Sequence, residues 1–219
     1  MKPWAVFDVD GTLLPGTSME KLFVYGAMVD GLISFPQIFA FGIESLKKIP
    51  ERGLIRAVKQ NKHFFKNLSA KEVQELGKVV FQKEILPKLS ETGMNRVQQH
   101  REEGYRVLLM SGAPEFLVTH LVEMLQPDFL ISSRLEIVDG VYTGRLISPH
   151  PYGEEKKRRL LEVQEELQID FSNSIVYANH FSDVAHMLLF GKPIAVNPDK
   201  KLLKFAIAHQ WAVEYWNSG

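Results

Sequence analysis

The chain has 219 residues, in which 26 lysines and arginines balance 26 aspartates and glutamates, and it contains no cysteine. The balanced charge gives no indication of nucleic acid as a partner, because nucleic-acid-binding proteins usually carry an excess of basic residues. The lack of cysteine excludes disulfides, thiolate metal sites and a thiol nucleophile. The first residues lead directly into a strand instead of the apolar helix of a secretory signal, so we expect a cytoplasmic protein.

The first predicted strand, residues 5–7, ends at two carboxylates, Asp8 and Asp10. Because side chains alternate along an extended chain, both carboxylates lie on the same side. A turn at Gly11 and Thr12 follows, and glycine lets the backbone bend sharply beside a ligand. Such a pair can supply a nucleophile and its acid–base partner, and two adjacent anions also attract a divalent cation.

Residues 16–88 contain no such strand and are predicted to be helical, with a capping box at residues 69–72. We expect this segment to form an inserted cap over the strand ends. Its apolar stretch at residues 22–46 is interrupted by Asp30 and Pro36, so we expect no membrane span, which needs ~20 apolar residues. Its apolar face is expected to pack inside the cap; a homodimer interface and an apolar substrate pocket are the two other interpretations.

After residue 88, short apolar runs alternate with helical periodicity, which is typical of a parallel sheet wrapped by helices. An Asp-Gly turn at Asp139 and Gly140 predicts a hairpin within residues 135–147, beside the main sheet. The predicted strands are residues 107–110, 129–131, 175–177 and 194–196, and the predicted helices are residues 90–103, 114–125, 154–168 and one from about 199.

The expected fold class is therefore α/β: a Rossmann-like parallel sheet with helices on both faces, an inserted helical cap and a small β-hairpin. The expected domains are a core of residues 1–15 and 89–219 and a cap of residues 16–88.

Two anion-binding features follow the second strand and precede a later helix. Ser111 and Gly112 stand before a predicted helix whose first residue is Pro114, and helix N-termini favour phosphate. The alternative is that Ser111 only caps that helix. Lys156 begins another helix, where it can offer a fixed cation to carboxylates and a phosphate, and Lys157 is the alternative one position later.

A fourth feature follows the strand at residues 175–177, where Asn179 precedes Asp183 by four positions. Both side chains offer the oxygen ligands that Mg²⁺ prefers. The intervening His180 is expected to be a neighbour instead of a ligand, since imidazole suits Mg²⁺ less well. The four features stand in order at the carboxyl ends of predicted strands, which is where open α/β sheets bind ligands.

These residues resemble the four motifs of the haloacid dehalogenase-like phosphohydrolases, and the resemblance covers nearly the whole chain. The helical insertion resembles the phosphoserine-phosphatase-like branch. The chain departs from the family where Asn179 replaces the first of two acids in the fourth motif. The phosphoserine enzymes also carry an acid soon after the first motif, but Glu20 falls too late to be matched with it.

The resemblance implies a two-step phosphomonoester hydrolysis on a small phosphorylated metabolite. It implies that Asp8 attacks phosphorus and Asp10 acts as acid and base. The implied phosphate-binding residues are Gly11, Thr12, Ser111, Gly112 and Lys156, and the implied Mg²⁺ ligands are Asp8, the Asp10 carbonyl, Asn179 and Asp183. Two alternatives remain: a phosphotransferase that uses an alcohol acceptor, and a weakly active or non-catalytic phosphate-binding protein, which Asn179 would explain.

Overall fold

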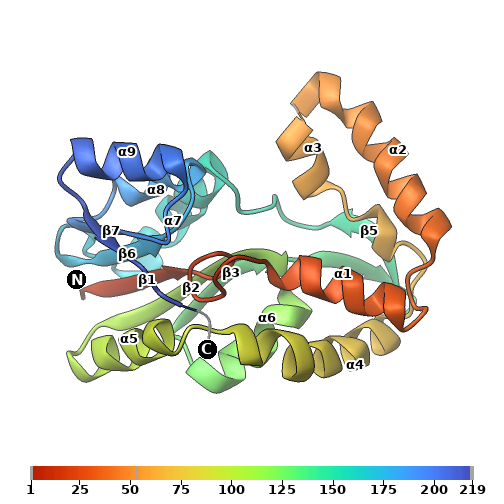
Figure 1. The fold of residues 1–219 in the computed structure, drawn as a ribbon, viewed down its shortest axis with the longest axis horizontal. Helices are drawn as coiled ribbons and strands as arrows, with labels where there is room; N and C mark the ends of the chain where they lie inside the picture. Colours follow the sequence, from red (N-terminus) through yellow and green to blue (C-terminus); the bar gives the residue numbers. More distant parts are fainter. Residues whose placement is uncertain (1, 53, 218–219) are drawn as a thin grey trace.

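The computed structural model describes residues 2–52 and 54–217 and contains a six-stranded, all-parallel sheet in the order β3-β2-β1-β6-β7-β8 (Figure 1). The predicted α/β fold is thereby confirmed. The strands are β1 (Trp4–Asp8), β2 (Arg106–Pro114), β3 (Phe129–Ser133), β6 (Ile175–Ala178), β7 (Lys192–Val196) and β8 (Ala212–Glu214). The edge strand β8 was not predicted, because its three residues are too few to show a period.

Strand β1 explains why the sheet is covered on both faces. All five of its residues are buried. Ala5 and Phe7 join one hydrophobic cluster, whereas Trp4 and Val6 join a second cluster on the opposite face. Alternating side chains that are all apolar require cover on both sides of a sheet, and helices supply it.

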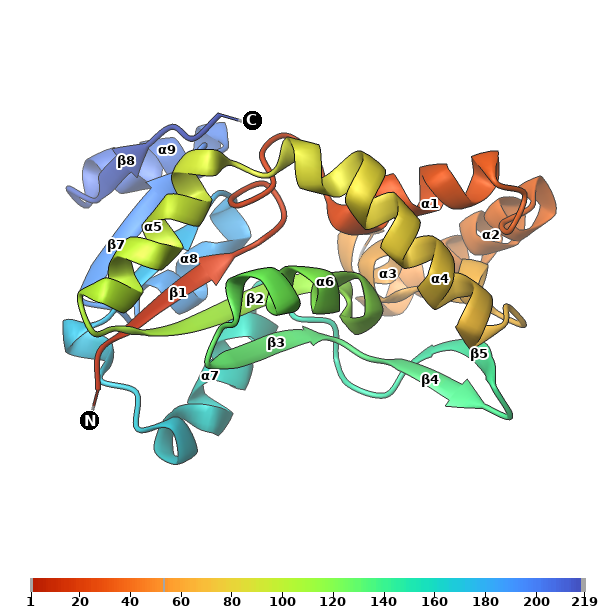
Figure 2. The same cartoon turned by 90° about the horizontal axis from the view of Figure 1, so that it is seen from below.

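The covering helices are α5 (Glu91–Glu102) and α6 (Glu115–Leu125) on one face, and α7 (Glu154–Leu167), α8 (Val184–Met187) and α9 (Lys200–Ala208) on the other (Figure 2). Ser90 and Asp199 cap α5 and α9 by accepting from backbone amides of the first turn. One detail differs from the prediction. Strand β2 extends to Pro114, which is the N-cap of α6 and not its first helical residue.

The segment of residues 16–88, hereafter the cap segment, contains only helices in its described part. They are α1 (Met19–Val29), α2 (Phe35–Arg52), α3 (Leu54–Gln60), α4 (Ala70–Val80) and the short turns His63–Phe65, Phe81–Ile85 and Leu86–Lys88. Ser69 caps α4 by accepting from the Glu72 amide at 3.4 Å. In residues 2–52 and 54–217 no helix is both long and apolar enough to cross a bilayer. The domain boundaries at residues 15 and 89 stay a prediction.

The apolar stretch of the cap segment is only partly packed inside. Phe23, Ala27 and Ile33 are buried, as expected for an inner face. By contrast, Phe35 and Phe39 on α2 are 75% and 65% exposed. The expectation of an internal apolar face therefore holds for Phe23 and Ala27 on α1 but fails for Tyr25 and Val29 on the same helix, which are 66% and 73% exposed, and for the outer side of α2.

The hairpin forms where the Asp-Gly turn predicts it, as β4 (Leu135–Val138) and β5 (Val141–Leu146). Asp139 and Gly140 both have positive φ angles, 49° and 78°, as a two-residue hairpin turn requires. Its position differs from the expected one beside the main sheet. The hairpin is a separate sheet that bonds to the cap segment, since Ala70 N donates to Gly140 O at 2.9 Å and Asn67 N to Tyr142 O at 2.8 Å.

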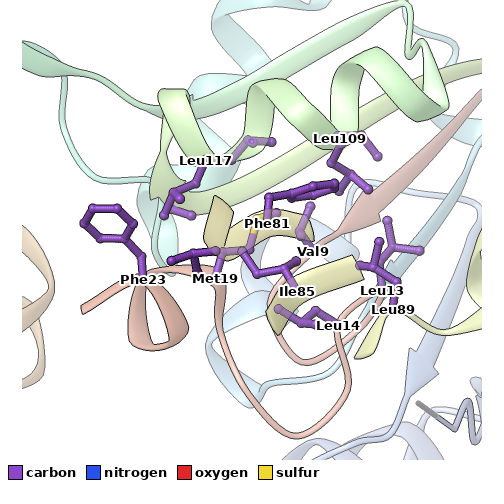
Figure 3. Packing of buried hydrophobic residues seen from close by; sticks show 14 of the residues in the cluster. Val9, Leu13, Leu14, Met19, Phe23, Phe81, Ile85, Leu89, Leu109 and Leu117 are labelled. Atoms are coloured by element: carbon purple, nitrogen blue, oxygen red, sulfur yellow. The ribbon is translucent and has the colours of Figure 1, made fainter. Parts of the chain in front are cut away.

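One hydrophobic cluster joins the loop after β1 to the cap segment (Figure 3). Val9, Leu13 and Leu14 of the loop are fully buried, and the cluster continues into Met19 and Phe23 of α1. Phe81, Ile85, Leu89, Leu109 and Leu117 also belong to it. The loop that carries the paired carboxylates is therefore fixed on both sides by packing.

Candidate active site

The two carboxylates after β1 are held by different donors. Asp8 accepts from Lys156 Nζ at 2.6 Å through Oδ1 and from Thr12 Oγ1 at 3.1 Å through Oδ2. Asp10 accepts from the Met19 amide at 2.8 Å through Oδ1 and from Ser111 Oγ at 3.1 Å through Oδ2. The first carboxylate is therefore paired with a cation, whereas the second contacts only neutral donors.

Lys156 lies in the first turn of α7 and links two acids. Its Nζ donates to Asp183 Oδ1 at 2.8 Å as well as to Asp8, and all three side chains are buried. Lys157, the alternative from the sequence, lines a neighbouring cavity instead, which shares Lys59, His150 and Tyr152 with the main one. The geometry thus brings Lys156, and not its neighbour, to the carboxylates.

Burial controls the protonation of these groups. Burial, together with the nearby Asp183 and Asp10 and against the effect of Lys156, raises the pKa of Asp8 to about 7. Burial also raises the pKa of Asp10. For Asp183, the penalty of burial is outweighed by Lys156, so its pKa is lowered. Burial alone would lower the pKa of Lys156, but Asp183 and Asp8 hold it above its usual value.

Some of the predicted phosphate-binding residues already use their hydrogen-bond donors within the protein. Gly11 N donates to Leu14 O at 2.8 Å, and Thr12 gives its amide to Val9 O and its hydroxyl to Asp8. The amides of Gly11 and Thr12 and the Thr12 hydroxyl are therefore engaged inside the loop, and the phosphate-binding role of these two residues stays a prediction.

The turn after β2 brings a second part of the chain to the carboxylates. The Ser111 hydroxyl donates to Asp10 and accepts from Ala113 N at 3.0 Å. Because Pro114 occupies the N-cap position, the alternative that Ser111 caps α6 is wrong. Ser111 and Gly112 stand at the edge of the site, and Gly112 lines the main cavity.

Asn179 closes the site from the end of β6. A Cβ atom on Gly11 would lie 2.0 Å from Asn179 Nδ2, so only glycine leaves room for this amide. One end of the carboxamide lies 3.1 Å from Asp8 Oδ2 and 3.2 Å from the Asp10 carbonyl oxygen. With nitrogen at this end, the amide donates to both oxygens. With oxygen at this end, three acceptors converge and a cation must lie among them.

This oxygen set fits Mg²⁺. Neighbouring ligands in an octahedron with bonds of about 2.0–2.1 Å lie roughly 3 Å apart, which is close to the two separations at Asn179. His180 stays outside this set, because its ring nitrogens contact Ser182 Oγ at 2.8 Å and Asp199 Oδ2 at 3.3 Å.

A cavity of about 930 Å³ extends from these residues to the cap segment. Its far wall is apolar and includes Val24, Ile38, Phe41 and Phe64. Two polar features of the cavity had no motif in the sequence. Lys62 is buried and donates to both oxygens of Glu20, at 2.5 and 2.7 Å. His150 lies over Gly112 from the core side.

Comparison with known proteins identifies the family. The model of the haloacid dehalogenase-like hydrolase family matches residues 5–187. The chain is 26% identical over 216 residues to phosphoserine phosphatase SerB1 of Mycobacterium tuberculosis, covering 95% of this chain and 69% of that protein. It is 28% identical over 221 residues to a histidinol-phosphatase of Neisseria meningitidis, covering 97% and 98%.

A solved structure has the same fold. It is described as a phospho-aspartyl intermediate analogue of phosphoserine phosphatase, and it matches 98% of this chain and 93% of its own with a TM-score of 0.66 and 19% identity. The predicted family and the predicted enzyme class, a phosphatase, are confirmed.

Proposed function

We propose that the chain, which belongs to the haloacid dehalogenase-like hydrolase family, hydrolyses a small phosphomonoester through an aspartyl-phosphate on Asp8, with Mg²⁺ as cofactor. The observation that carries the proposal is the buried Asp8 carboxylate, paired with Lys156 at 2.6 Å at the floor of a large cavity. A carboxylate without its hydration shell, held in one orientation, is prepared for nucleophilic attack.

In the first step, an Asp8 oxygen forms a bond to phosphorus while the bond from phosphorus to the ester oxygen breaks. Asp10, whose pKa is raised by burial, gives its proton to the departing alcohol oxygen. In the second step, Asp10 takes a proton from a water molecule, whose oxygen attacks the aspartyl-phosphate. The products are inorganic phosphate and the free Asp8 carboxylate.

The remaining residues of the site orient the phosphoryl group and neutralise the negative charges around it. Lys156 and Ser111 hold the phosphoryl oxygens as negative charge moves among them. Asp8, the Asp10 carbonyl, Asn179 and Asp183 would hold Mg²⁺, which supplies positive charge that offsets the crowded anions. Closure of the cap segment would exclude bulk water during the transfer.

The proposal is tested by phosphate release from a panel of phosphomonoesters with Mg²⁺. The panel includes phosphoserine and histidinol phosphate, because two similar proteins are named phosphoserine phosphatase and histidinol-phosphatase. Asp8→Asn should abolish release, at least ~10³-fold, since a neutral amide cannot attack phosphorus, while its thermal melt shows an intact fold. Release by Asp8→Asn at the wild-type rate would contradict the covalent mechanism.

The same assay distinguishes the alternatives. Transfer to an added alcohol, seen as a new ester in place of phosphate, would indicate a phosphotransferase. Binding of phosphate without turnover of any ester would indicate a non-catalytic protein. The cytoplasmic location and a homodimer through the cap segment stay predictions.

A further inference from the structure

His150 is one of the polar residues of the cavity that the proposed reaction does not use. It lies between β5 and α7, and it is 5% exposed. A Cβ atom on Gly112 would meet its Cε1 at 2.6 Å and its Nε2 at 2.7 Å. The ring edge therefore rests on the glycine of the turn that holds Ser111.

The hydrogen bonds of Ser133 determine which ring nitrogen carries the proton. Ser133 Oγ lies 2.8 Å from the Gly112 carbonyl oxygen and 2.9 Å from His150 Nδ1. A carbonyl oxygen can only accept, so the single hydroxyl proton must point to Gly112. The hydroxyl oxygen then accepts from His150, which fixes the proton on Nδ1 and leaves Nε2 with a free lone pair.

This lone pair opens into the cavity. Within residues 2–52 and 54–217, His150 Nε2 has no hydrogen-bond partner. The fully buried side-chain atoms without a partner in these ranges are Trp4 Nε1, Ser148 Oγ and His186 Nδ1, so Nε2, which is not among them, is partly accessible to solvent. The exposed part of His150 therefore includes Nε2. His150 lines both the main cavity and the neighbouring one at Lys157, but Gly112, against which Nε2 lies, lines only the main cavity. Burial and the charges of Lys62, Lys59 and Lys156 hold the pKa of His150 well below its usual value, so the ring stays neutral.

A neutral acceptor at this position selects the chemistry of its ligand. A lone pair repels the oxygens of a phosphate dianion, so Nε2 is unsuited to hold the phosphoryl group. It is suited to an N–H or O–H donor. Because the ring touches Gly112 beside the phosphate turn, that donor must lie close to the ester.

We propose that His150 Nε2 is a specificity-determining acceptor for a hydroxyl or amino group on the carbon next to the ester carbon of the substrate. Ser133 is its positioning residue, since it fixes the tautomer. The substrate class is therefore a 1,2-diol or 1,2-amino alcohol monophosphate. This inference rests on the proposed phosphatase function.

The test compares kcat/KM for three esters of similar size: 2-hydroxyethyl, 2-aminoethyl and propyl phosphate. Wild type should prefer the two donor-bearing esters over propyl phosphate by about tenfold or more, since one neutral hydrogen bond is worth about tenfold and the ammonium of the amino ester makes a stronger one. His150→Phe keeps a ring without an acceptor, and the preference should fall to about onefold. His150→Gln, which restores an acceptor, should recover part of it. Ser133→Ala should weaken the preference by releasing the tautomer.

A matched control is His209→Phe at the C-cap of α9, an exposed histidine outside the cavity, which should keep the wild-type preference. An unchanged preference in His150→Phe, or an equal loss on all three esters, would overturn the role of His150. Failure of wild type to release phosphate from any ester of the larger panel contradicts the proposed function instead, so the two failures are distinguishable.

A measurement on the wild-type protein covers the case in which His150→Phe does not fold. Nitrogen NMR of histidine-labelled protein reports which ring nitrogen is protonated, and the His150 signals are assigned by their loss in His150→Gln. We expect a proton on Nδ1 and none on Nε2. A proton on Nε2 would make that atom a donor and would overturn the proposal.

Discussion

At the scale of single residues, Asp8 and Asp10 differ in their surroundings although they are two positions apart. Lys156 accompanies Asp8, whereas Asp10 contacts the Met19 amide and the Ser111 hydroxyl. A carboxylate with a cation partner is suited to attack in its ionised form. A buried carboxyl with neutral partners can carry a proton near neutral pH, as an acid–base group must.

The raised pKa of Asp8 predicts a pH-dependent stability without metal. Its folded pKa of about 7 lies above the ordinary value of 3.8, so its contribution is full below pH 4 and is lost as the pH rises toward 7. In EDTA, the Tm of Asp8→Asn minus that of wild type should therefore increase from pH 4 to 8. Burial lowers the pKa values of His150 and His186, so these groups make both proteins more stable as the pH rises. Subtracting the wild-type Tm cancels this common trend. A flat difference would show that Asp8 ionises normally.

Asn179 can serve the site in two states, because its carboxamide offers either a donor or an acceptor to Asp8 and to the Asp10 carbonyl. An aspartate there could only accept. The amide therefore lets the crowded acids coexist without metal, at the cost of one negative charge in the ligand set.

We expect Asn179→Asp to lower the Mg²⁺ concentration for half-maximal phosphate release by about tenfold, or ~1.4 kcal/mol of binding free energy. The reason is that the affinity of the site for Mg²⁺ depends on the negative charge of its ligands. Without metal the same variant should melt at a lower temperature than wild type, because another carboxylate joins Asp8 and Asp10. The maximal rate is not diagnostic, as the added anion also repels phosphate. An unchanged or higher Mg²⁺ requirement would exclude Asn179 from the ligand set.

Residues at the ends of core strands could be predicted from the sequence, whereas Lys62 of the cap segment and His150 of the loop before α7 could not. Asp8, Ser111 and Asn179 each follow a short apolar run, and parallel strands bring their carboxyl ends together. Lys62 and His150 follow no such run. Their positions depend on how helices α2 and α3 and the loop before α7 pack. No repeating pattern of neighbouring residues in the sequence predicts this packing.

At the scale of elements, the hairpin links core and cap segment through a turn that needs positive φ angles. A Cβ atom on Gly140 would meet nothing within 4 Å, so any cost of a side chain there comes from its φ of 78°. We expect Gly140→Ala to destabilise the protein by about 1–2 kcal/mol.

Gly42 provides the matched control for this prediction. It also has open space around it, but it lies within helix α2, where Gly→Ala should be neutral or stabilising by up to about 1 kcal/mol. Urea unfolding of both variants gives the comparison. Equal effects of the two substitutions would contradict the assigned turn geometry.

Local chemistry also explains which elements the sequence predicted. Ser90 and Asp199 mark helix starts, and Asp139 with Gly140 marks the hairpin turn. The position of that hairpin depends on its bonds to Ala70 and Asn67. Such contacts between distant segments have no signature in a single sequence.

At the scale of the whole molecule, helix α2 lies at the periphery (Figure 1), and its outer side departs from a buried apolar pattern. Phe35, Phe39, Ile43 and Leu46 are 75%, 65%, 40% and 64% exposed and follow a helical spacing. Contiguous exposed apolar residues of this kind are typical of interaction surfaces. The homodimer through this surface stays a prediction that can be tested.

We expect light scattering to show a dimer at micromolar concentrations and Phe39→Glu to make it monomeric, because a dimer would bury a charge in place of an aromatic ring. Ile207→Glu is the control, since Ile207 is 67% exposed on α9, away from this surface. It should leave the mass unchanged. A monomeric wild type up to about 100 μM, a concentration at which typical specific interfaces are formed, would contradict the homodimer. In that case the exposed side of α2 would belong to the monomer surface, and the proposed phosphatase site, whose carboxylates, lysine and serine contact one another within one chain, would need no partner.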